Sequence, residues 1–148
     1  MVVDIGGTMP SGYCSDSTRT YVAGGAAPTA FVAAYEVLLA AQSAQREYAR
    51  AGVPAESVDD VGRRILSDAG YGDLFIHRTG HGIGLETHED PYIVAGNTQE
   101  LEPGMAFSIE PGFYVAGEYG ARIEDIVVAS TNGLDVLNAT ARDLVTLG

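Results

Sequence analysis

Apolar residues recur along this chain in two different rhythms, which predict a mixture of helices and strands. Between residues 30 and 51 they return every three or four positions, the period of one buried helix face. The predicted stripe consists of Phe31, Tyr35, Leu38, Gln42 and Gln45. Pro28 near the start and Gly52 just past the end are typical of helix termini.

A second helix is predicted over residues 57–69, where apolar residues return with the same period. Ser57, with Asp60 three positions later, resembles a capping box at the N-terminus of this helix. We interpret both helices as scaffold whose charged residues lie on solvated faces.

Short runs of apolar and β-branched residues predict strands on both sides of the helices. Residues 1–5 predict a short buried strand, and residues 13–22 predict a second strand after a turn that contains Pro10. Further strands are predicted at residues 106–110, 113–115 and 121–129, and a short closing strand after the turn at residues 132–133.

The first predicted hairpin contains two aspartates. If its turn centres on Pro10, the ladder pairs are Asp4–Asp16, Gly6–Cys14 and Thr8–Gly12. Two opposed carboxylates repel each other unless one is protonated or a cation lies between them. A slipped or bulged register would instead place the aspartates on opposite, solvated faces, and the hairpin alone leaves both interpretations open. We expect Cys14 to pack near this site without binding a metal.

Two glutamates form a similar pair later in the chain. Glu110 and Glu124 are fourteen residues apart and Gly117 lies midway, so a hairpin centred there sets them opposite each other. Pro111 interrupts this ladder, which makes the register an inference.

Residues 75–91, FIHRTGHGIGLETHEDP, contain all three histidines of the chain, His77, His81 and His88. In a regular strand, residues seven apart point to opposite faces. His81 and His88 can therefore share one site only if the chain is kinked or looped at the glycines between them. The alternative is a glycine-rich loop with solvated histidines.

Composition restricts the class of protein. A chain of 148 residues, 46% hydrophobic and 19% charged, is typical of one soluble globular domain. The net charge of −12 argues against nucleic acid or an anionic membrane surface as a partner. The single cysteine excludes an internal disulfide, and no apolar run approaches membrane-spanning length, so we expect a cytoplasmic protein.

Four carboxylates and one imidazole form a hard, oxygen-rich set of candidate metal ligands. These are Asp4, Asp16, Glu110 and Glu124, with a histidine that lies between the two pairs in the sequence. Such a set suits two divalent first-row ions, such as Mn²⁺, Co²⁺, Fe²⁺ or Zn²⁺, with bridging carboxylates. Two ions about 3.5–4 Å apart can activate a shared water and polarise a carbonyl, so the ligand set predicts hydrolysis.

The segments that carry these residues resemble a known family. In order, they are DIGG, GYCSDSTRTY, HRTGHGIGLETHEDP, SIEPGFY and ARIEDIVV. Together they resemble the catalytic domain of the pita-bread metallopeptidases, in the Xaa-Pro dipeptidase (prolidase) and Xaa-Pro aminopeptidase branch, over residues 2–137. The resemblance implies an α+β pita-bread (creatinase/aminopeptidase-like) fold, a curved antiparallel sheet with helices on its outer face. Residues 1–148 would be the C-terminal part of that catalytic domain, without its upstream part.

The resemblance also assigns roles. It implies two divalent ions, Mn²⁺ first, held by Asp4, Asp16, His81, Glu110 and Glu124, with Asp16 and Glu124 bridging. Glu110 matches the ligand that also acts as general base. His88 matches the histidine that contacts the substrate and stabilises the tetrahedral intermediate, and His77 matches a histidine of the substrate pocket.

Arg122 matches an arginine near the substrate carboxylate. Besides the missing upstream part, the chain departs from the family pattern in two places. The two aspartates are twelve apart where eleven is usual, and Tyr92 stands where an arginine often follows the HE-x-P proline. The second departure puts recognition of a dipeptide carboxylate in doubt.

The implied activity is hydrolysis of Xaa-Pro dipeptides or N-terminal Xaa-Pro bonds by a hydroxide that the two metal ions activate. A peptide is the implied substrate, and a homodimer is one assembly that the sequence leaves open. Three alternatives are a methionine aminopeptidase, an inactive fragment of a peptidase, and a non-catalytic binding module on the same fold.

Overall fold

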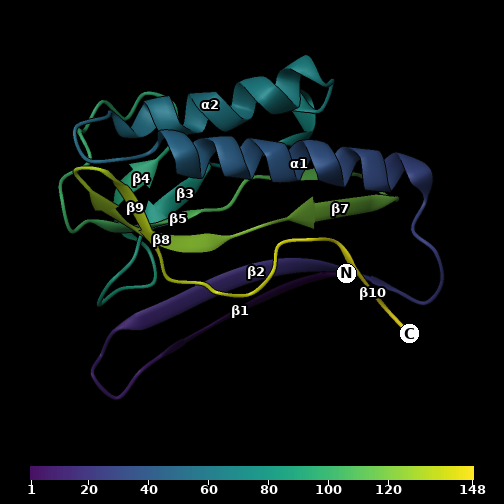
Figure 1. The fold of residues 1–148 in the computed structure, drawn as a ribbon, viewed down its shortest axis with the longest axis horizontal. Coiled ribbons are helices and arrows are strands. Elements are labelled where there is room, and N and C mark those ends of the chain that lie inside the picture. The colour runs from purple at the N-terminus through teal and green to yellow at the C-terminus, as the bar shows by residue number, and fades with distance from the viewer.

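The computed structural model describes residues 1–148 and packs two helices over a set of strands (Figure 1). Helices α1 (Thr29–Tyr48) and α2 (Ala55–Asp68) lie side by side on one face, and the hairpin of β1 and β2 lies on the other side (Figure 1). The strands are β1 (Val2–Thr8), β2 (Cys14–Ala23), β3 (Gly80–Gly82), β4 (Glu89–Ile93), β5 (Ala106–Ile109), β6 (Gly112–Val115), β7 (Tyr119–Arg122), β8 (Asp125–Ser130), β9 (Gly133–Val136) and β10 (Val145–Leu147), with a 3₁₀ turn at Gly72–Leu74. The predicted α+β class is confirmed.

The strands form three sheets, with orders β1-β2-β10, β4-β3-β5-β8-β9 and β6-β7. Every pairing is antiparallel except one. β10 runs parallel to β2 at the edge of the first sheet. This pairing brings the C-terminal strand beside the N-terminal hairpin (Figure 1).

The predicted register of the first hairpin is wrong by two residues. Asp4 pairs with Thr18, and Asp16 pairs with Gly6. A shift of two keeps every side chain on its face, so the two aspartates still share one face as diagonal neighbours. The expectation that the first strand is buried is also wrong. β1 is an edge strand, and the side chain of Ile5 is 67% exposed.

The predicted register of the glutamate pair is confirmed. Gly112 pairs with Arg122 on one side of Pro111, and Ile109 pairs with Asp125 on the other side. Both pairs belong to one continuous register. Glu110 and Glu124 therefore face each other in the gap between the two ladders. The turn centres on Gly117, whose φ of +77° favours glycine.

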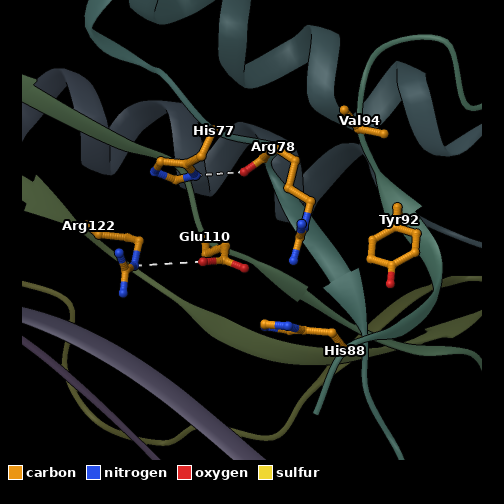
Figure 2. A pocket seen from close by; sticks show the side chains of 7 residues that line it. All are labelled: His77, Arg78, His88, Tyr92, Val94, Glu110 and Arg122. Atoms are coloured by element: carbon orange, nitrogen blue, oxygen red, sulfur yellow. Dashed lines mark hydrogen bonds and ion pairs between the residues drawn. The ribbon is translucent and has the colours of Figure 1, made fainter. Parts of the chain in front are cut away.

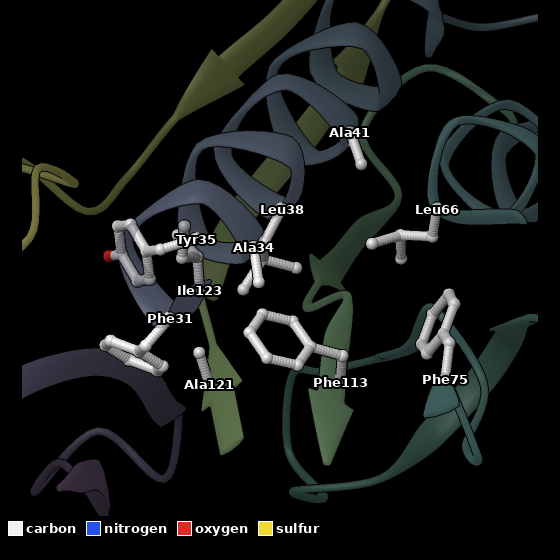
Figure 3. Close-up of a cluster of buried hydrophobic side chains, with 10 residues drawn as sticks. All are labelled: Phe31, Ala34, Tyr35, Leu38, Ala41, Leu66, Phe75, Phe113, Ala121 and Ile123. Atoms are coloured by element: carbon white, nitrogen blue, oxygen red, sulfur yellow. The ribbon is translucent and has the colours of Figure 1, made fainter. Parts of the chain in front are cut away.

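The predicted apolar stripe of α1 is confirmed, because all five of its residues are buried. The apolar residues of this stripe pack with residues from α2, β6 and β7 in one core cluster (Figure 3). That cluster consists of Phe31, Ala34, Tyr35, Leu38, Ala41, Leu66, Phe75, Phe113, Ala121 and Ile123. A second cluster centres on Phe107, Ile109 and Val127 beneath the other end of the helices. Neither helix combines the length and apolar character needed to cross a membrane.

Helix α2 begins two residues earlier than predicted. Pro54 is its N-cap and no side chain caps it, so the predicted capping box at Ser57 is wrong. Proline before the first turn fixes φ, and the backbone N–H of Ser57 bonds the Pro54 carbonyl instead.

The charged face of α2 is not wholly solvated, contrary to the prediction. Asp59 is 1% exposed and accepts two hydrogen bonds from Arg63, at 2.8 and 2.9 Å. Asp59 also accepts the backbone N–H of Thr79, and Arg63 donates to the carbonyls of Phe75 and His77. Helix α2 therefore holds the histidine segment in place.

Candidate metal centre

The histidine segment folds as two short strands joined by a loop, which confirms the predicted kink. At Gly80 and Gly82 the neighbouring backbone comes so close that an added Cβ would lie 1.9 Å from the Ser108 carbonyl oxygen and 2.2 Å from that of Asp90. The β3–β4 register shifts between these glycines. The loop returns the chain so that the ring centroids of His81 and His88 lie 4.1 Å apart.

Three of the five predicted ligands meet in one cluster. The ligand atoms of Asp16, His81 and Glu124 all lie within 4.8 Å of one another. A backbone bond of 3.0 Å from the Glu124 N–H to the Thr18 carbonyl joins β2 to the residue that precedes β8. This contact brings Asp16, two residues before Thr18, toward Glu124.

Glu110 joins the cluster through His81. Its Oε1 lies 3.2 Å from His81 Nε2 and accepts a hydrogen bond of 2.9 Å from Ser108. Ser108 in turn accepts the backbone N–H of His81 at 3.0 Å. One serine therefore orients both predicted ligands.

Asp4 stands apart from the three-residue cluster. Its carboxylate forms an ion pair with Arg122 Nη2 and is 49% exposed. Arg122 Nε lies 3.7 Å from Glu110 Oε2, so Arg122 links Asp4 to the rest of the predicted ligands. The structure thus gathers four of the five candidates directly and the fifth through an arginine.

The electrostatics of this cluster favour a cation. Burial, followed by repulsion from Glu110, raises the pKa of Glu124 to about 8. Burial and the neighbouring Asp4 raise the pKa of Asp16. A raised pKa means that the ionised form of the carboxylate is poorly compensated by its surroundings, so without a cation the group tends to keep its proton. A divalent cation would compensate it, and carboxylate oxygens with one imidazole are suitable ligands.

His81 and Glu110 shift the pKa values of each other in opposite directions. Burial lowers the pKa of His81, but hydrogen bonds to Glu110 and to the Gly82 carbonyl outweigh burial, so the net pKa is raised. Burial likewise tends to raise the pKa of Glu110, and its bond to His81 reverses the direction. Glu110 is therefore ionised at neutral pH.

A pocket of about 760 Å³ opens beside the cluster (Figure 2). Four predicted residues line it, namely His77, His88, Glu110 and Arg122, together with Arg78, Tyr92 and Val94. His77 Nδ1 lies 2.8 Å from the Arg78 carbonyl oxygen, and its Nε2 lies 3.2 Å from the Tyr114 hydroxyl. Burial lowers the pKa of His77.

Sequence reasoning missed several residues that orient the site. Thr18 donates a hydrogen bond of 2.6 Å to Glu124, and Tyr114 accepts one of 3.0 Å from Arg122. The strand period of two could have indicated Thr18 and Ser108, because each lies two residues from a predicted ligand on the same face. No comparable signal marks Tyr114 or Arg78.

Cys14 is half-buried and lies outside the three-residue cluster. Its sulfur is 3.7 Å from both the Thr8 hydroxyl and the Leu85 carbonyl oxygen.

Comparison with known proteins reveals close relatives. The chain is 55% identical over 146 residues to a protein of Mycobacterium tuberculosis named probable dipeptidase PepE, and 49% identical over 141 residues to an Xaa-Pro dipeptidase of Lactobacillus delbrueckii. These matches cover 98% and 95% of this chain but 38% of each relative. The crystal structure of dipeptidase PepE from Mycobacterium ulcerans superimposes with a TM-score of 0.94 at 54% identity, over 98% of this chain and 39% of that one.

The same fold appears in the prolidase from Pyrococcus furiosus, with a TM-score of 0.92 at 41% identity over 95% of this chain and 41% of that one. The predicted pita-bread fold is thereby confirmed. The chain spans about two fifths of the length of these relatives. The model of metallopeptidase family M24 matches residues 1–131. The chain therefore belongs to metallopeptidase family M24.

Proposed function

We propose that residues 1–148 form the C-terminal part of the catalytic domain of a peptidase that hydrolyses Xaa-Pro dipeptides with two divalent metal ions. One observation carries this proposal. Asp16, His81 and Glu124 converge at the side of a pocket whose wall contains Glu110 and His88. A relative named Xaa-Pro dipeptidase, 49% identical to this chain, supports the choice of substrate.

Five residues would hold the ions, namely Asp4, Asp16, His81, Glu110 and Glu124, with Asp16 and Glu124 bridging. The ions, Mn²⁺ in the first instance, would supply Lewis acidity and an activated water when bound. Asp16 and Glu124 suit the bridging role because both are close to His81 and the ionised form of each is poorly compensated in the metal-free chain.

Glu110 is proposed as the general base. It is ionised at neutral pH and lies on the wall of the pocket, so it can accept a proton from a water there. The hydrogen bond from Ser108 holds its carboxylate in one orientation.

His88 is proposed to stabilise the tetrahedral intermediate. Desolvation and the neighbouring His81 and Arg78 lower the pKa of His88, so the ring is neutral at pH 7. A neutral imidazole carries one N–H that can donate a hydrogen bond to the developing oxyanion. His77 and Arg122 are proposed to contact the substrate, since both line the same pocket.

The test measures metal content and turnover separately. The 148-residue chain is loaded with Mn²⁺, Co²⁺, Fe²⁺ or Zn²⁺, its metal content is determined by elemental analysis, and hydrolysis of an Xaa-Pro dipeptide is compared with hydrolysis of Xaa-Ala. Two bound ions and selective cleavage are expected. Bound metal without any cleavage would instead support the inactive fragment, and absence of metal would support the binding module.

Two histidine variants separate the proposed roles. His81→Ala should reduce metal binding, because it removes a ligand. His88→Ala should leave the metal content unchanged and slow turnover, because it removes only a contact with the intermediate. Asp60→Asn, on the exposed side of α2, is the control and should change neither quantity. Loss of metal in His88→Ala would contradict the assignment of His88.

A further inference from the structure

The chain between the last two strands runs from β9 along β2 to β10 (Figure 1). This segment, residues 137–144, lies beyond residues 1–131, which the family model matches. None of the roles proposed above uses it. One of its residues, Asn138, is half-buried and bonds the backbone of two different strands, at Asp16 and at Ile126.

The backbone segments that carry Asp16 and Glu124 touch directly at one point. Thr18 and Glu124 form an isolated antiparallel bridge, in which the Glu124 N–H donates to the Thr18 carbonyl at 3.0 Å. Hydrogen-bonded pairs of an antiparallel ladder recur every two residues, so the next pair would be Asp16 with Ile126. That pair is absent, because β2 and β8 belong to different sheets and no ladder extends beyond the bridge.

The side-chain amide of Asn138 takes the place of the missing backbone bond. Its Nδ2 donates to the Asp16 carbonyl at 3.0 Å, and its Oδ1 accepts the Ile126 N–H. The Leu137 N–H donates to the Ile126 carbonyl at 2.9 Å. Directly paired strands lie about 4.8 Å apart. An amide group inserted between the N–H of one strand and the carbonyl of the other therefore holds the two strands further apart.

A side chain also replaces backbone pairing on the other side of the bridge. The Thr20 hydroxyl donates to the Arg122 carbonyl at 2.9 Å and accepts the Arg122 N–H at 3.1 Å. The strands therefore part in both directions from the bridge. Asp16 and Glu124 are diagonal neighbours across this opening, so the distance between their carboxylates depends on how far the strands part at Asn138.

The segment that carries Asn138 is anchored in the interior of the protein. Arg142 forms an ion pair with Asp125, which is fully buried. Arg19, which is 5% exposed, donates to the Thr140 carbonyl at 2.8 Å. Because the segment is held on its own side, Asn138 can fix a distance between the strands that it joins.

We propose that Asn138 is a positioning residue that sets the separation of Asp16 and Glu124, so that both carboxylates can bind the same two metal ions. This inference rests on the proposed two-metal function and adds a residue that binds no metal itself. Without the amide, the Asp16 carbonyl and the Ile126 N–H lose their partners, and the strands either close toward direct pairing or separate. Either movement changes the distance between the two carboxylates.

The first test counts the metal ions and reports their separation. Residues that orient metal ligands through hydrogen bonds contribute roughly 10- to 100-fold to metal affinity. Asn138→Ala should therefore bind one of the two Mn²⁺ ions weaker by about that factor, measured by isothermal titration and elemental analysis. In electron paramagnetic resonance, the spectrum of two exchange-coupled Mn²⁺ ions in the wild type should be replaced by that of uncoupled Mn²⁺.

Asn97→Ala is the matched control. Asn97 is also half-buried, its Nδ2 donates to the Tyr92 carbonyl at 2.7 Å, and its Oδ1 accepts the Gln99 N–H at 3.1 Å. This variant removes the same two kinds of backbone contact away from the candidate ligands, so it should change neither the Mn²⁺ affinities nor the spectrum. Thermal melting compares the stability of the two variants. Loss of one ion in both would assign the effect to general destabilisation and overturn the role of Asn138.

A second variant and a metal-free measurement keep the test decisive if Asn138→Ala folds poorly. Asn138→Gln keeps both hydrogen-bonding groups on an arm that is longer by one methylene group. It should bind two ions with an altered exchange coupling, because their separation changes. In the metal-free wild type, the Ile126 N–H should exchange with solvent more slowly than in either variant. An unchanged spectrum or an unchanged exchange rate in both variants would overturn the proposal.

The two proposals fail in different ways. Two coupled ions in both the wild type and Asn138→Ala would overturn the role of Asn138 and leave the peptidase function in place. Two coupled ions in a wild type that cleaves no peptide, with loss of the coupling in Asn138→Ala, would overturn the proposed activity and leave the role of Asn138 in place. A wild type that binds no metal would overturn both.

Discussion

The two strand pairs that carry the candidate carboxylates differ in how firmly the rest of the molecule holds them. Glu124 is 1% exposed, and its neighbours Ile123 and Asp125 are fully buried. Asp4 lies on edge strand β1, where its side chain is 49% exposed and its ionic partner is Arg122. Candidate carboxylate ligands thus occur both in the packed interior and near solvent.

Strand β2 lies between these two regions, and the side chains on its inner face hold it in place. Arg19 of β2 is 5% exposed and donates to Asp125 at 2.7 Å and to the Glu124 carbonyl. The next strand outward, β1, pairs only with β2. The buried pair of strands therefore sets the geometry of the site, and β1 adds the candidate ligand Asp4 at its rim.

The largest expected effect concerns the core beneath the buried region. Phe113→Ala removes a fully buried ring between α1 and β7 and should lower the free energy of unfolding by about 3–5 kcal/mol. Ile5→Ala, on the exposed β1, should cost less than about 0.5 kcal/mol. Urea denaturation monitored by circular dichroism measures both. Similar losses would mean that β1 packs against the molecule more closely than its exposure indicates.

The next effect concerns the helix that holds the histidine segment. Asp59→Ala removes the buried partner of Arg63 and the acceptor of the Thr79 N–H, and should lower the free energy of unfolding by about 2–3 kcal/mol. Asp60→Ala removes the adjacent carboxylate, which forms the same i,i+4 pair with Arg64 at the exposed surface. This control should cost about 0.5 kcal/mol or less. An equal loss of stability in Asp60→Ala would argue that α2 does not hold the histidine segment in place.

A third effect depends on pH in the metal-free chain. The pKa of Glu124 is about 8 in the folded state, above its value in the unfolded chain, so the folded state binds more protons between pH 4.5 and 8. The stability contribution of this group is therefore complete below pH 4.5 and is lost as pH rises toward 8. Between pH 5 and 7 the wild type should lose about 2 kcal/mol more than Glu124→Gln, measured by denaturation after treatment with a chelator. Parallel pH profiles would contradict the raised pKa.

The smallest expected effect concerns the metal affinity that each of the two regions contributes. Glu124→Gln should weaken Mn²⁺ binding about tenfold more than Asp4→Asn, a difference of about 1.4 kcal/mol. The buried carboxylate acts in a lower effective dielectric, whereas the charge of Asp4 is partly screened by solvent and paired with Arg122. Calorimetric titration of each variant measures the affinities. A greater loss in Asp4→Asn would place the main binding determinant on the exposed hairpin.

Local pattern was sufficient where burial or a turn restricts the chain. The stripe of α1 follows from helical periodicity, and the glutamate register follows from the position of Gly117 between two strands with buried faces. The loop between His81 and His88 follows from Gly82 and Gly84, which no regular strand would need, because β3 ends at Gly82. The register of β1 could not be predicted in this way, because most of this strand is exposed and a slip of two residues costs little burial.

The sequence by itself determined the helices, the glutamate hairpin and the types of residue that can bind a metal. Only the tertiary structure decided how these residues meet. Thr18 bonds Glu124 across 106 positions, Arg122 bonds Asp4 across 118, and α2 turns an acidic residue inward to hold the histidine segment. The physical reason is that periodicity and turn chemistry act over a few residues, whereas such contacts form only after separate segments have packed together.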